Sequence, residues 1–169
     1  MKIFPSSIYL VILVLVAGCM HYSAGPGTSL EFDKIYVAPV KNDSFAPQAQ
    51  ALLTKQIRTK LANCPGLELA SSSENAAILE VTIIDFGQSM ATTRDDDTIR
   101  AKSFDVKMSV SCTLSDDATG KVYFKNYHMS DSVECHAFDD NFQASQYQAI
   151  PQLTNKLADK ICDAVCNPW

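Results

Sequence analysis

The chain has little glycine and none of the glycine-based motifs that serve catalysis or phosphate binding. Glycine accounts for 6 of its 169 residues, and the sequence contains no Gly-x-Ser-x-Gly turn and no Gly-rich loop. The Cys-x-x-Cys and His-x-x-x-His spacings that frame many zinc sites are also missing. From these absences we expect no enzyme activity, no resident metal and no cofactor.

Positive charge is scarce as well. The chain carries 14 Lys and Arg against 19 Asp and Glu, which gives a net charge of −5 at pH 7. Proteins that bind nucleic acids usually have a basic excess on one face, so this balance argues against a nucleic-acid partner. The fractions of hydrophobic residues (47%) and charged residues (20%) are ordinary for a globular protein.

The apolar run near the N-terminus is too short to span a membrane. Ile8–Val16 follows Lys2 and is well below the roughly 20 residues that a span needs, but it fits the hydrophobic region of a signal peptide. The small residues Ala17 and Gly18 then precede Cys19. This pattern resembles the lipobox of bacterial lipoproteins, in which the cysteine thiol carries a diacylglycerol.

We therefore expect a signal peptide over 1–18, lipidation of Cys19, a tether over 19–30 and a single α+β domain over 31–169. Met20 stands after the cysteine, and the absence of Asp there favours the outer membrane, by similarity to enterobacterial sorting. The lipid-anchored domain would then lie on the periplasmic face. The alternative is a membrane anchor that is never cleaved, with an unmodified Cys19.

Cysteine usage is consistent with an exported protein. Five cysteines remain besides Cys19, and an oxidising compartment makes one or two disulfides plausible. An odd number leaves at least one thiol without an intramolecular partner. The connectivity stays open among Cys64, Cys112, Cys135, Cys162 and Cys166.

Hydrophobic periodicity predicts the element order β-α-β-β-β-β-α. The predicted strands cover 35–40, 67–70, 77–86, 103–114 and 121–133, and the predicted helices cover 46–62 and 142–165. Pro39 suggests an edge position or a break in the first strand. Each helix has one apolar stripe to bury. We therefore expect a two-layer α+β sandwich, with two helices on one face of a four- to five-stranded, mostly antiparallel sheet whose first two strands run parallel.

One pair of residues could suggest a thiol nucleophile. Cys135 and His136 are adjacent, with Asp139 and Asp140 close in sequence. Neighbouring side chains on a strand point to opposite faces, so the thiol and the imidazole cannot easily share a proton. A buried or disulfide-linked cysteine is therefore the favoured interpretation.

Several soft motifs follow one another along the mature chain. They are Cys19–Tyr22, the turn Asn42–Ser44, the helix Leu53–Leu61, the strand entry Ala76–Val81, the hairpin Leu114–Val122 and the terminal helix. In this order they resemble the LptE family of lipopolysaccharide-assembly lipoproteins, over nearly the whole mature chain. The family usually has Gly-Tyr-His or a similar pair after the lipidated cysteine, and Met-His-Tyr stands here instead.

The resemblance implies the same fold and a role as a plug inside an LptD-like outer-membrane β-barrel. It also implies help with barrel assembly and contact with lipopolysaccharide. A polar outward surface suits a polar barrel interior, and the alternating strand supplies Asp105, Lys107, Ser109, Ser111 and Thr113. The alternative is a freestanding lipoprotein that faces the periplasm and binds a glycan or small ligand.

Lipid A phosphates require basic partners, and arginine is preferred because its donors are forked. The candidates for lipopolysaccharide binding are Arg94, Arg100 and Lys102, and the family's basic residue in this connection matches Arg94 loosely. Asp95–Asp97 follow directly and would repel a phosphate, or hold it through a divalent cation. A solvated loop whose charges pair with each other is the third possibility.

Overall fold

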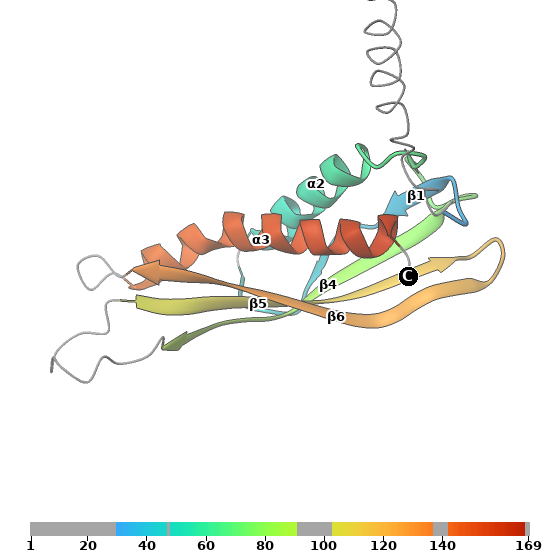
Figure 1. Cartoon of the computed structure of the whole chain (residues 1–169). Coiled ribbons are helices and arrows are strands. Elements are labelled where there is room, and N and C mark those ends of the chain that lie inside the picture. The colour runs from blue at the N-terminus through green and yellow to red at the C-terminus, as the bar shows by residue number, and fades with distance from the viewer. Residues whose placement is uncertain (1–29, 47, 91–102, 137–141, 168–169) are drawn as a thin grey trace, which may run out of the picture.

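Two helices and a six-stranded sheet form the part of the chain that the computed structural model describes, residues 30–46, 48–90, 103–136 and 142–167. Figure 1 shows both helices on one face of the sheet. The predicted α+β sandwich is thus confirmed, with one more strand than predicted. In chain order the elements are β1 (Lys34–Val37), β2 (Lys41–Asn42), α2 (Ala49–Leu61), β3 (Glu68–Leu69), β4 (Ala77–Met90), β5 (Ser103–Asp116), β6 (Lys121–His136) and α3 (Phe142–Cys166).

The sheet is mixed, and its strand order is β3-β1-β4-β5-β6, with β2 pairing to β4. The long strands β4, β5 and β6 are antiparallel to one another. The short β1 runs parallel to both β3 and β4, and β2 runs parallel to β4. The predicted parallel pairing of the strands on either side of the first helix is confirmed by the register of Ile35 with Leu69.

The pairing with β4 is interrupted at Pro39 and Val40. The N–H of Ala38 still donates to the Leu79 carbonyl at 3.0 Å, but the next N–H on this side of the strand, that of Val40, donates to the Thr54 hydroxyl at 3.1 Å. The predicted first strand is therefore divided into β1 and β2, both of which pair with β4. Of the two possibilities that Pro39 raised, the break is confirmed.

A hydrogen-bonded turn between β2 and α2 shifts the start of the first helix. The Asn42 amide donates to the Ala46 carbonyl at 2.8 Å, and the backbone N–H of Ser44 donates to the Asn42 side-chain oxygen at 3.0 Å. The Ser44 hydroxyl bonds the same oxygen at 2.7 Å. Because these bonds hold Ala46 in a turn, α2 begins at Ala49, and the predicted start at residue 46 is wrong.

The core lies between the helices and one face of the sheet. The apolar positions predicted for both helices and for the alternating strand are all buried, so the predicted faces are confirmed. The core members on α2 are Ala49, Leu53, Ile57 and Leu61, those on β5 are Phe104, Val106, Met108, Val110, Cys112 and Leu114, and those on α3 are Ile150, Leu153, Leu157, Ile161 and Val165.

A disulfide joins the C-terminal ends of the two helices. Cys64 follows α2 and Cys166 ends α3, with 6.6 Å between their Cα atoms. Cys112, Cys135 and Cys162 are free thiols. The bond closes a loop with a sequence separation of 102 residues, so it restricts the unfolded chain strongly.

The signal peptide over 1–18, Cys19 and the tether up to residue 29 lie outside the described residues. Within the described part of the chain, no helix is long and apolar enough to cross a membrane.

Candidate functional site

The sequence-predicted ligand residues Arg94, Arg100 and Lys102 lie outside the described residues. The strands that flank them are described: β4 ends at Met90, which is opposite Phe104 in β5. The contact of these three residues with lipopolysaccharide therefore stays a prediction.

The described surroundings of Cys135 do not activate its thiol. Its side chain is half-buried, and its Sγ lies 3.9 Å from the carbonyl oxygen of Val133. Burial, with a smaller contribution from the charge of Asp105, raises the pKa of the Cys135 thiol. A raised pKa disfavours the thiolate, which is the reactive form.

The sheet face opposite the helices carries short hydroxyl side chains across its three long strands. On β5 the outward residues predicted from the sequence are half-buried, except for Lys107, which is exposed. Cross-strand rows continue the pattern on both neighbours. The rows are Glu80–Thr113, Thr82–Ser111–His128, Asp85–Ser109–Ser130, Gly87–Lys107–Ser132 and Ser89–Asp105–Glu134. We call these residues the hydroxyl face.

The hydroxyl face differs chemically from the helix-covered face of the same strands. The covered face holds the apolar core, whereas these five rows contain no large apolar side chain; on the same face, such side chains stand in the adjoining row Ile78–Ser115–Val122. Its charges are of both signs, and Glu80 pairs with Lys41 at 3.5 Å. A sheet with one wet and one packed face is typical of antiparallel architecture. The hydroxyl face can therefore form many hydrogen bonds with a polar surface.

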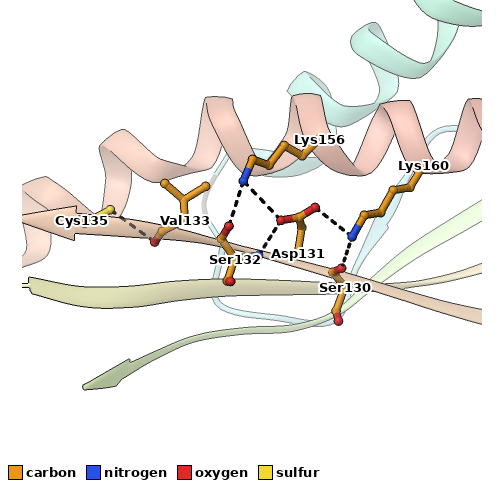
Figure 2. A network of polar contacts seen from close by, with 7 residues as sticks. All are labelled: Ser130, Asp131, Ser132, Val133, Cys135, Lys156 and Lys160. Atoms are coloured by element: carbon orange, nitrogen blue, oxygen red, sulfur yellow. Dashed lines mark hydrogen bonds and ion pairs between the residues drawn. The ribbon is translucent and has the colours of Figure 1, made fainter. Parts of the chain in front are cut away.

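A second polar feature joins α3 to the edge strand β6. Asp131 stands on β6 opposite the fully buried Met108, and two lysines of α3 reach it. Lys160 Nζ lies 2.9 Å from Asp131 Oδ2, and Lys156 Nζ lies 3.5 Å from Oδ1. Figure 2 shows the three side chains converging between the helix and the strand. We call Asp131, Lys156 and Lys160 the lysine clamp.

The lysine clamp also binds the backbone of β6. Lys160 donates to the Ser130 carbonyl at 2.7 Å, and Lys156 donates to the Ser132 carbonyl at 3.1 Å. The N–H of Ser132 donates to Asp131 Oδ1 at 2.8 Å. In an antiparallel ladder, alternate residues turn these backbone groups away from the partner strand. The clamp therefore occupies groups that face the free side of the sheet.

Electrostatics favour the charged form of Asp131. Burial by itself would raise the pKa of its carboxyl. Hydrogen bonds from Lys160 and from the Ser132 N–H, together with the charges of Lys160 and Lys156, outweigh burial and hold the pKa below its ordinary value of 3.8. The lysine clamp is thus formed at neutral pH.

Sequence reasoning did not single out the lysine clamp. The signal was present: Lys156 and Lys160 are one helical turn apart, and Asp131 stands between Met129 and Val133 at an inward-facing strand position. A charge at such a position on an edge strand is a known device against unwanted strand pairing.

A groove of about 480 Å³ adjoins the lysine clamp. It lies between β6 and the C-terminal half of α3. Its walls combine an aromatic ring with polar and charged side chains. They are formed by Tyr127, His128, Met129, Ser130, Lys160, Asp163, Ala164 and Asn167.

Burial keeps two of the free thiols in the protonated form. Burial raises the pKa of Cys112 to about 12. Burial is also the largest cause of the raised pKa of Cys162, which is about 12. Among the residues that the structure describes, no cluster of three or more His, Cys, Asp or Glu side chains could hold a metal ion.

The fold and these surfaces describe a two-layer α+β domain with one broad polar sheet face. No protein-family model and no curated protein sequence matches the chain.

Solved structures share the fold. Lipoprotein B from Nitrosomonas europaea, described as uncharacterized, has a TM-score of 0.57 at 13% identity, over 84% of this chain and 87% of that one. A minor lipoprotein from Acinetobacter baumannii has a TM-score of 0.54 at 13% identity, over 80% and 93% of the two chains. The fold is therefore one that bacterial lipoproteins adopt. At this level of identity the similarity concerns the fold alone.

Proposed function

We propose that the chain is a lipid-anchored lipoprotein of the lipopolysaccharide-assembly machinery at the outer membrane. Cys19 is its lipidated residue, and the domain occupies the periplasmic side of an LptD-like β-barrel as a plug. The role requires binding surfaces and no catalytic group. The sequence pattern around Cys19 supports the anchor, and the shared fold of known lipoproteins is consistent with it.

The observation that carries the proposal is the hydroxyl face. A barrel lumen is lined by polar side chains, and a plug must replace water on many such groups without leaving any of them unpaired. Short hydroxyls both donate and accept hydrogen bonds, and they can rotate to fit either need. Ser109, Ser111 and Thr113 on the central strand lie at the middle of this face.

The test is a pull-down of the full chain from detergent-solubilised outer membranes. We expect a very large β-barrel protein to co-purify in about equal amount with the wild-type chain. Ser109→Glu combined with Ser111→Glu would place two unpaired charges on the hydroxyl face and should abolish recovery of the barrel, because a desolvated charge without a partner is costly.

The matched control is Gln152→Glu combined with Asn155→Glu, which adds the same charge to exposed positions of α3. The control should recover the barrel as the wild type does. Recovery of the chain as a monomer, together with unchanged surface lipopolysaccharide after depletion, would reject the proposal. Equal recovery by the face variant would reject the hydroxyl face as the contact surface.

We place lipopolysaccharide contact at Arg94, Arg100 and Lys102, on the basis of the family resemblance and of phosphate chemistry. Replacing the three residues by Glu in the full chain should weaken binding of purified lipopolysaccharide while leaving barrel recovery intact. Unchanged binding would end this assignment. Loss of wild-type binding upon chelation of divalent cations would show that Asp95–Asp97 act through a bridging cation.

A second candidate function is supported by the groove beside the lysine clamp. An aromatic ring next to charged and amide side chains is suited to a sugar, and this groove offers Tyr127, Asp163 and Asn167. A neuraminyllactose-binding hemagglutinin homolog from Helicobacter pylori has the same fold, with a TM-score of 0.54 at 9% identity, over 86% of this chain and 89% of that one. In this case Asp163→Ala should remove glycan binding by the full chain, and no barrel should co-purify.

A further inference from the structure

Strand β4 is paired on both sides along its first part only. On the side away from β5, β1 pairs with Ala77–Leu79, and β2 pairs with Thr82 and Ile83. The last bond on this side runs from the Asp43 N–H to the Ile83 carbonyl, at 2.9 Å. Beyond Ile83, β5 continues to pair with β4 up to Met90, whereas no described residue pairs on the other side. We call Asp85–Met90 the open edge.

The register identifies the backbone groups that face outward at the open edge. The carbonyls of Leu79 and Ile83 accept hydrogen bonds from the β1–β2 side, and these residues lie opposite even-numbered residues of β5. The β-bulge at Ile84 shifts the register by one residue. After it, the residues opposite even-numbered partners are Phe86, Gln88 and Met90. By the alternation of an antiparallel ladder, their N–H and C=O groups point away from β5.

The open edge has few of the features that keep strands apart. A guarded edge is short, bulged, covered, or carries lysine, proline or an inward-facing charge. The segment Asp85–Met90 contains no lysine and no proline, and its single charge is that of the exposed Asp85. The lysine clamp, by contrast, fills the equivalent groups of β6 at Ser130 and Ser132.

The sequence of the open edge is complementary to itself. In an antiparallel pairing about a two-fold axis at Gly87, Phe86 meets Gln88 of a second copy, and Asp85 meets Ser89. No like charges then face each other, and the Ser89 hydroxyl can donate to the Asp85 carboxylate. Because Phe86 and Gln88 form the hydrogen-bonded pairs, Gly87 falls in the non-hydrogen-bonded position, where the Cα atoms come closest.

An exposed aromatic side chain follows closely after the last residue that bonds β4 on this side. Phe45 follows Asp43 by two positions in the chain and is 96% exposed. The turn that carries it is fixed by the bonds of Asn42 and Ser44. Ile84, at the bulge, is 38% exposed. A strand added beside Phe86 would end next to the bond between Asp43 and Ile83.

We propose that the open edge of β4 pairs with the open edge of a second copy of this chain. The two strands are antiparallel across a two-fold axis at Gly87, so that one sheet continues through both copies. This inference does not depend on the function proposed above, because it concerns copies that are not bound to a barrel.

The test is a disulfide trap in the full chain. In Gly87→Cys the two new thiols face each other across the axis, at a Cα separation of about 4.5 Å that a disulfide can bridge. Apart from Gly87 itself and its two chain neighbours, no atom of the single chain lies within 4 Å of the new Cβ, so the variant should fold. Mild oxidation in intact cells should give a band at twice the mass of the chain, and reduction should remove it.

The matched control is Ser132→Cys, which lies in the same cross-strand row but on the clamped edge. This control and the wild-type chain should remain at the mass of one chain. Adding Gln88→Pro to Gly87→Cys removes an outward N–H and should abolish the doubled band, because the paired backbones lose a hydrogen bond.

Three results of the crosslinking experiment would overturn the proposal. The first is a Gly87→Cys band no stronger than that of Ser132→Cys. The second is a band that survives Gln88→Pro, since pairing would then not use this backbone. The third is a crosslink at the mass of a different protein, which would assign the open edge to another partner. Sedimentation of the wild-type chain in detergent gives an independent reading, and a mass that stays at one chain at all concentrations would also reject the pairing.

Discussion

The two exposed edges of the sheet, at β6 and at the end of β4, differ in how their outward backbone groups are bonded. On β6, the lysine clamp binds the Ser130 and Ser132 carbonyls. On β4, no described side chain binds the outward backbone of Asp85–Met90. The difference arises from the position of α3, because the contacts between α3 and the sheet involve β5 and β6. Figure 1 shows α3 lying along the β5 and β6 side of the sheet.

This comparison shows how one helix can determine where a sheet stays open. Lysine side chains on α3 are long enough to wrap from the helix to the backbone at the border of the sheet, and they keep their charged ends partly in water. The hydrogen bonds that they make use the same groups that an added strand would need. An edge beyond the reach of such a helix keeps its ability to pair.

The largest predicted effect on stability comes from removing the disulfide that holds the C-terminal end of α3. Cys64→Ser removes the disulfide to Cys166 and should lower the free energy of unfolding by about 4.7 kcal/mol, because the chain-entropy model assigns this amount to a loop of about 100 residues. Urea unfolding of the full chain in mild detergent measures the change. Release of the C-terminal end of α3 should also loosen the lysine clamp, which the same helix carries.

Cys162→Ser is the control for this prediction. It removes a half-buried sulfur from the same helix, in a groove that Cys64 and Cys166 also line, without touching the disulfide. The control should unfold close to the wild type. Equal destabilisation by the two variants would show that packing of sulfur at this end, and not the crosslink, holds α3 in place.

The second effect breaks the lysine clamp directly. Asp131→Ala removes the acceptor that both lysines share, and we expect a loss of about 1.5–3 kcal/mol, the range for hydrogen bonds to charged groups. Asp85→Ala makes the same change at the open edge. Asp85 is exposed, so this control should stay within about 0.5 kcal/mol of the wild type. Similar losses in the two variants would contradict the distinction between the edges.

Much of the fold could be predicted because its cause is local. The alternation from Phe104 to Leu114 identified the buried face of β5, and helical spacing identified the buried stripes of α2 and α3. Pro39 indicated a possible break in the first strand, and the break lies between β1 and β2. The start of α2 was wrong because the Asn42 amide holds Ala46 in a turn, a side-chain bond that competes with the helix and leaves little trace in hydrophobic periodicity.

The candidate surfaces were predictable only in part. The outward residues of β5 were identified from alternation, and the register then showed how β4 and β6 extend them into the hydroxyl face. The lysine clamp and the open edge depend on which strands are neighbours and where α3 lies, and these are long-range properties. The pairing of Cys64 with Cys166 is of the same kind, since spacing alone left every connectivity open.

A smaller effect on stability is expected when a single backbone N–H is removed from either edge. Ser132→Pro removes the donor to Asp131 Oδ1 and should cost about 1 kcal/mol for the lost hydrogen bond. Gln88→Pro removes an outward N–H that has no described partner within one chain, so its cost should be lower when unfolding is followed at low protein concentration. A larger loss for Gln88→Pro would mean that the open edge is already paired under those conditions.

The smallest effect is the acid sensitivity of the clamped edge. The folded-state pKa of Asp131 lies below its ordinary value of 3.8, so the charged carboxylate contributes stability that is fully present above the unfolded-state pKa. This contribution is lost as the pH falls through the lower, folded-state pKa.

The difference in unfolding free energy between the wild type and Asp131→Asn should therefore be constant near neutral pH and shrink below about pH 4. Denaturant titrations across this range measure it, with Asp85→Asn as the matched substitution at an exposed position of the open edge. A difference that stays constant down to the lowest accessible pH would mean that Asp131 is held by packing and neutral hydrogen bonds. The lysines would then guard β6 through its carbonyls alone, and the clamped edge would differ from the open edge in backbone hydrogen bonding but not in charge.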